Sequence, residues 1–165
     1  MILKHLLTHG LFYSIIVTGS LFLMMVTMSP RVWGYSDYSQ EIKNKVPAQT
    51  KSEKRQAMLV ALPWIVFVLG FPIYSTLLLK SKLSNEIPIL IAFLNLFLMY
   101  LLVTIGDLVI LDWLIISKIM PSFVIIPGTE KEDYKDFSHH YKGHVKATAV
   151  LIPILLLAAV VIALL

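Results

Sequence analysis

The sequence contains no cysteine and little charge, and both features narrow what the protein can be. Without cysteine there are no disulfides and no thiolate metal ligands. Charged residues make up 15% of the 165 residues and hydrophobic residues 58%, whereas an ordinary soluble domain has about 25% charged residues. Phosphate-binding loops, dinucleotide-binding glycine patterns and nucleophile-elbow serine motifs are also absent. We therefore expect membrane lipids, and no nucleic acid, as partners.

Long stretches of the chain carry no charge at all. A helix of about 20 apolar residues crosses a hydrocarbon layer about 30 Å thick. Three windows contain no Lys, Arg, Asp or Glu, namely 6–28, 57–79 and 147–165, and a fourth, 88–116, is interrupted only by Asp107 and Asp112. The pattern predicts an all-α fold, a polytopic bundle of four transmembrane helices in a single membrane domain over 1–165. The predicted helices span about 6–28, 57–79, 89–116 and 147–165.

The sequence also predicts local structure within the two longer connections, 29–56 and 117–146. Residues 38–46 suit a short interfacial helix, which Pro47 would end. Thr50 and Glu53 have the spacing of a capping box, which indicates a helix start. In the second connection, the prolines at 121 and 127 forbid a continuous helix, so we expect a partly extended segment there.

The basic residues are unevenly distributed between the two ends of the predicted bundle. The connections 29–56 and 117–146 hold all Lys and Arg except Lys4, Lys80 and Lys82. Basic residues concentrate on the cytoplasmic side of membrane proteins. We therefore expect a protein integral to the cell membrane, with both of these loops cytoplasmic and both termini outside.

Asp107 lies inside an apolar window, which makes it the first candidate functional residue. A carboxylate in hydrocarbon is costly unless it is partnered or protonated. Asp107 can therefore be a proton relay, cation ligand or substrate anchor, or it can form a structural ion pair with a loop Lys or Arg. We expect Asp112 to lie in the headgroup region. Asp107, Asp112 and His140 are the catalytic candidates if the protein is an enzyme.

A second group of candidates precedes the fourth predicted helix. Asp136, His140 and His144 are spaced i, i+4, i+8, which aligns them on one helical stripe. A carboxylate with two imidazoles can hold a divalent zinc, iron or manganese ion, and Asp107 or Glu130 can complete the ligand set. The alternative is that these histidines contact headgroups or nearby acids. His5 and His9 form another i, i+4 pair, but at the opposite end of the bundle, where we expect an interfacial pair.

Short motifs along most of the chain resemble those of a group of small four-helix prokaryotic integral membrane proteins. The resemblance implies the four-helix architecture and brings no catalytic residue or activity with it. The residues that carry it are Pro30-Arg31-Val32-Trp33, Tyr38, Glu41-Ile42, Gly106-Asp107, Asp112-Trp113, Ile126-Pro127-Gly128-Thr129-Glu130, Tyr134-Lys135-Asp136-Phe137 and His140.

Three functions fit these observations. The first is a binding or accessory role at the cytoplasmic membrane surface through the polar Asp/His cluster, as a monomer or a homo-oligomer. The second is a membrane-embedded, metal-dependent enzyme acting on a lipid-like substrate. The third is a small proton- or cation-coupled transporter, which would have to work as a dimer because four helices with one deep acid leave little room for a path.

Overall fold

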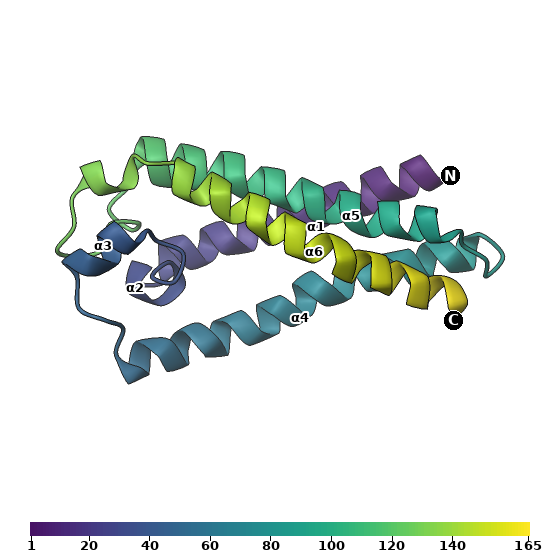
Figure 1. The fold of residues 1–165 in the computed structure, drawn as a ribbon, viewed down its shortest axis with the longest axis horizontal. Coiled ribbons are helices and arrows are strands. Elements are labelled where there is room, and N and C mark those ends of the chain that lie inside the picture. The colour runs from purple at the N-terminus through teal and green to yellow at the C-terminus, as the bar shows by residue number, and fades with distance from the viewer.

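The computed structural model describes residues 1–165 and is all-α, as predicted. It has four helices that are long and apolar enough to cross a membrane. The helical elements are α1 (Ile2–Thr27), α2 (Pro30–Trp33), α3 (Gln40–Lys45), α4 (Lys51–Lys82), α5 (Ile89–Gly106), η1 (Asp107–Ile119), η2 (Lys131–Tyr134) and α6 (Ser138–Leu164). The helix η1 continues α5 directly, and the two together form the third long helix (Figure 1).

The long helices extend beyond the uncharged windows at most of their ends. Helix α4 begins at Lys51 because the expected capping box forms: the Thr50 hydroxyl accepts from the Glu53 N–H at 3.2 Å, and the Glu53 carboxylate accepts from the Thr50 N–H at 2.7 Å. Helix α6 begins at Ser138, well before the predicted start at 147. The charged turns of both helices therefore project from the apolar part of the bundle.

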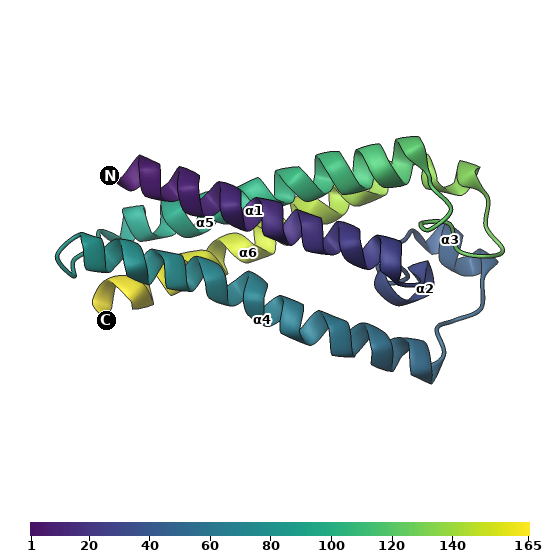
Figure 2. The ribbon, with the colours of Figure 1, turned by 180° about the vertical axis from the view of Figure 1, so that it is seen from behind.

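The four long helices run antiparallel, so the chain has two distinct ends. Both termini and the α4–α5 turn lie at one end, which we call the terminal end (Figures 1 and 2). The elements α2, α3 and η2 lie at the other, which we call the loop end. Helix α5 contacts both α1 and α6 along the bundle, whereas the first half of α4 stands away from the other long helices.

At the loop end, the two longer connections fold against each other around buried tyrosines. The Tyr38 hydroxyl donates to the Val124 carbonyl at 2.8 Å, and the Tyr134 hydroxyl accepts from the Ile126 N–H at 2.9 Å. The two tyrosine rings pack edge to face at 5.2 Å. Between Met120 and Glu130 the chain is irregular, and Val124 and Ile126 point into this core with 0% exposure. The expected short helix in the first connection is present as α3.

We expect Tyr38→Phe to lower the free energy of unfolding by about 1–2 kcal/mol, because the buried Val124 carbonyl loses its donor while the ring packing remains. Thermal or denaturant unfolding of the detergent-solubilised protein measures the change. Tyr141→Phe is the matched control, because the Tyr141 side chain is 54% exposed and should give little change. Equal losses in the two variants would contradict a stabilising Tyr38–Val124 bond.

At the terminal end, His5 and His9 join α1 to α4. The Lys82 ammonium approaches His5 Nδ1 at 3.4 Å and can only donate, so Nε2 carries the ring hydrogen and donates to the Ser75 carbonyl at 3.0 Å. The Ser75 hydroxyl is 3.2 Å from His9 Nδ1. His5 is buried at 5% exposure and His9 is half-buried, so both rings pack against α4, while their depth in a membrane stays a prediction. The hydrogen bonds of both histidines therefore join α1 to α4, and we call this pair the His5–His9 clamp.

Candidate functional site

Helix η1 is a π-helix, and this geometry brings the two aspartates of the third long helix together. In an α-helix, residues five apart are separated by about 140° around the axis. In a π-helix each N–H bonds to the carbonyl five residues back, so residues five apart lie nearly above one another. Asp107 and Asp112 are spaced in this way within η1, which runs from Asp107 to Ile119. Both carboxylates therefore face α6.

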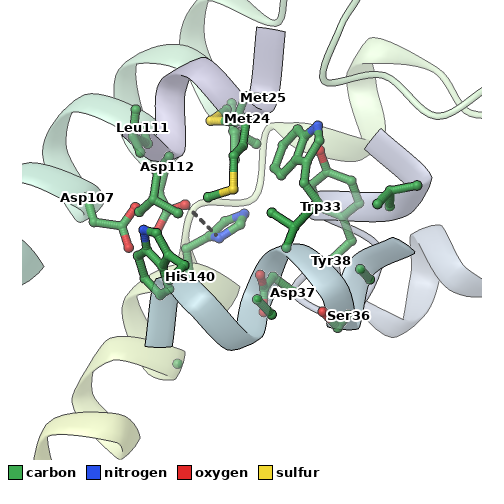
Figure 3. Close-up of a pocket in the computed structure, with 18 of the residues that line it drawn as sticks. Met24, Met25, Trp33, Ser36, Asp37, Tyr38, Asp107, Leu111, Asp112 and His140 are labelled. Atoms are coloured by element: carbon green, nitrogen blue, oxygen red, sulfur yellow. Dashed lines mark ion pairs between the residues drawn. The ribbon is translucent and has the colours of Figure 1, made fainter. Parts of the chain in front are cut away.

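Asp112 is the centre of the site. Its side chain meets two of the three histidines of α6: Oδ2 accepts from His144 Nε2 at 2.9 Å, and Oδ1 forms an ion pair with His140 Nδ1 at 3.2 Å. The same His144 nitrogen is 3.8 Å from Asp107 Oδ2. Figure 3 shows the Asp107, Asp112 and His140 side chains converging. Asp112 is buried against protein at 8% exposure, and its expected place at the depth of the headgroups stays a prediction.

Two of the predicted candidates lie outside this group. Asp136 precedes α6, which begins at Ser138, so it does not share the helical stripe with the two histidines. Its carboxylate instead accepts from the Ser138 N–H at 2.9 Å. Glu130 is exposed at the start of η2, where its N–H donates to Asp133 at 3.0 Å. The predicted stripe is therefore reduced to His140 and His144, and neither Asp136 nor Glu130 joins Asp112.

The expected structural partner of Asp107, a loop Lys or Arg, is not present. Two of the basic loop residues pair elsewhere: Arg31 with Glu53 at 2.5 Å and Lys45 with Asp133 at 2.5 Å. The one ion-pair partner of Asp107 is His144. Asp107 therefore lies with Asp112, His140 and His144, which we together call the Asp/His group, and it does not hold a loop in place.

A pocket of about 690 Å³ opens directly onto the Asp/His group. Of its 23 lining residues, 15 are hydrophobic, contributed by α1, the segment around α2, α4, η1 and α6. The apolar part includes Met24, Met25, Met28, Val60, Ala61, Trp64 and Ile65, and the polar part comprises Ser36, Asp37, Asp107, Asp112, His139, His140 and His144. Figure 3 shows Met24 and Met25 on one side of His140 and Asp107 and Asp112 on another.

Asp37 is a member of the polar part that the sequence patterns did not indicate. It lies in the connection between α2 and α3, and its backbone carbonyl accepts from His139 Nε2 at 3.0 Å. Burial, which removes water from the carboxyl group, and the nearby Asp112 carboxylate both raise the pKa of Asp37. No spacing rule links Asp37 to η1 or α6; the only signal is its place beside the aromatic residues of the first connection.

The geometry defines a helical protein with four apolar spans and an amphipathic pocket near its loop end. Comparisons of the chain with protein-family models, with curated proteins and with solved structures found no match. What the site can do therefore has to be argued from its own residues.

Proposed function

We propose that the protein is a small membrane protein that binds a lipid-like amphiphile, with the polar end of the ligand on the Asp/His group and its apolar part in the pocket. The observation that carries this proposal is the composition of the pocket wall, which is hydrophobic except where the aspartates and histidines meet. Ligand sites are commonly largely apolar with a few converging polar groups that fix orientation.

The size and position of the pocket support a lipid-like ligand. A volume of about 690 Å³ lies within the range of about 300–1,000 Å³ typical of small-molecule sites. Its apolar wall is formed by the first half of α4 together with the end of α1, and both belong to candidate membrane spans. A hydrocarbon chain can therefore reach the pocket from the bilayer without crossing water.

The polar end of the pocket favours a ligand at one membrane surface. The Asp/His group lies near the loop end, which also carries most of the Lys and Arg residues. By the positive-inside bias we assign this end to the cytoplasm and both termini to the opposite side. The protein would thus hold its ligand at the cytoplasmic leaflet.

The transport alternative lacks comparable support. Between the Asp/His group and the His5–His9 clamp, the bundle is filled by a buried cluster of Tyr13, Val17, Met99 and Val103. The pocket has no lining residue from the terminal end. A coupled transporter would need a polar path through this apolar layer.

We expect Ala61→Trp to abolish retention of the copurified amphiphile, because an indole at this position fills the pocket from the α4 wall. Native mass spectrometry and lipid extraction of the purified protein measure retention. Val66→Trp is the matched control, because Val66 lies on the same helix, is 71% exposed and does not line the pocket. The proposal fails if the parent protein carries no stoichiometric amphiphile, or if both tryptophan variants retain it equally.

A further inference from the structure

We infer that Asp107, Asp112 and His144 bind one divalent transition-metal ion at the polar end of the pocket. This metal site is separate from the amphiphile binding proposed above. It rests on the proposed function in one respect only: the group that fills the open coordination position would come from the amphiphile.

The donor atoms of these three residues already converge. One carboxylate oxygen from each aspartate and a ring nitrogen of His144 lie within 4.8 Å of one another. In a tetrahedral zinc site the ligand atoms are about 3.3 Å apart, so the side chains need to close by roughly 1–1.5 Å. The His144 Nε2 to Asp112 Oδ2 distance of 2.9 Å shows that one edge is already this short.

The charges around the pocket supply a separate reason to expect a cation. Three carboxylates line it, those of Asp37, Asp107 and Asp112, and no Lys or Arg side chain does. Buried charges are normally paired or coordinate a metal. The histidines are the only protein groups here that can offset this negative charge, and two of them point at the same carboxylate, that of Asp112. A divalent cation bound between the carboxylates would balance the negative charge that the histidines do not neutralise.

The residues around the donors have the arrangement of a metal site with an open position. His140 Nδ1 lies 3.2 Å from Asp112 Oδ1, so it can hold that carboxylate with Oδ2 turned toward His144. Metal-ligating carboxylates are commonly oriented by a neighbouring polar group in this way. Three protein ligands leave the fourth position to water or a ligand, and here that position faces the pocket. An oxygen of the amphiphile's polar end can fill it.

The test is Zn²⁺ binding by the full-length protein in detergent, purified without a polyhistidine tag and stripped with chelator. Elemental analysis after dialysis gives the stoichiometry, and competition with a chromophoric chelator gives the affinity. We expect one Zn²⁺ per chain. Because a mixed imidazole and carboxylate site follows the general order of divalent affinities, Mn²⁺ should bind more weakly and Mg²⁺ more weakly still.

We expect Asp107→Asn and His144→Ala each to weaken Zn²⁺ binding at least tenfold. The matched controls are Asp136→Asn and His9→Ala, which change an aspartate and a histidine outside both the donor set and the pocket, and these should stay within about twofold of the parent. Gel filtration and circular dichroism confirm that each variant is folded. Absence of stoichiometric Zn²⁺ in the parent, or equal weakening in donors and controls, overturns the proposal.

Measuring retained amphiphile on the same samples separates this site from the proposed function. Protein that retains amphiphile but binds no Zn²⁺ overturns the metal site alone. Protein that binds Zn²⁺ through the three donors but retains no amphiphile supports the metal site and overturns the lipid-like ligand.

Discussion

Asp112→Ala should lower the free energy of unfolding by about 3 kcal/mol, the largest loss that we expect among the substitutions considered for this protein. The carboxylate accepts from His144 at 2.9 Å, forms an ion pair with His140 at 3.2 Å and is 8% exposed. A hydrogen bond to a charged group contributes about 1.5–3 kcal/mol, and the substitution removes this bond together with the His140 ion pair. Both imidazoles would also lose the group that holds η1 against α6.

Unfolding of the detergent-solubilised variant, followed by circular dichroism, measures this loss. Glu86→Ala provides the control, since Glu86 is an exposed acid in the α4–α5 turn and its removal should change stability by less than about 0.5 kcal/mol. If Asp112→Ala were no more destabilising than Glu86→Ala, Asp112 would not join the two helices as described.

The second large effect is expected at the crossing of α1 and α5. Gly106→Ala should destabilise the protein by about 1–3 kcal/mol, because a Cβ there would lie 2.7 Å from Thr18 Oγ1 and 3.4 Å from Ser14 Oγ. Neither neighbour yields easily: Thr18 is buried and stiff at χ1, and the Ser14 hydroxyl already donates to the Leu102 carbonyl at 2.9 Å. Small residues at such crossings let membrane helices approach closely.

Gly19→Ala is the control for this substitution. Gly19 is also in a long helix, α1, but nothing lies within 4 Å of the position its Cβ would occupy. Thermal unfolding of both variants in the same detergent compares them. Equal stability of Gly106→Ala and Gly19→Ala would show that α1 and α5 do not pack closely at Gly106. Because Gly106 immediately precedes η1, the same variant also reports how firmly Asp107 is positioned.

The architecture could be predicted from the sequence because its signals are local. Uncharged windows long enough to cross a bilayer indicated the four long helices, and the Thr50–Glu53 spacing marked the start of α4. The meeting of η1 with the start of α6 at the loop end also followed, because four antiparallel helices place the end of the third and the start of the fourth at the same end.

The detailed composition of the site could not be predicted, because it depends on geometry that the sequence pattern does not contain. Residues 107–119 are rich in Leu and Ile, like the α-helix before them, and no residue pattern in the sequence distinguishes a π-helix from an α-helix here, so the alignment of Asp107 with Asp112 could not be predicted. The spacing of Asp136 and His140 fits one helical stripe only if a continuous helix includes both, whereas α6 starts after Asp136. Asp37 reaches the pocket through the fold of an irregular connection, for which no periodicity exists.

A structure of the protein in nanodiscs formed from its native membrane tests most directly whether the Asp/His group and the apolar pocket form one ligand site. We predict elongated density between Met25 and Trp64, ending within hydrogen-bonding or metal-bridged distance of Asp112 and His144. A pocket closed by α4 side chains, or lipid density that stays outside the bundle and never reaches Asp112, would contradict it.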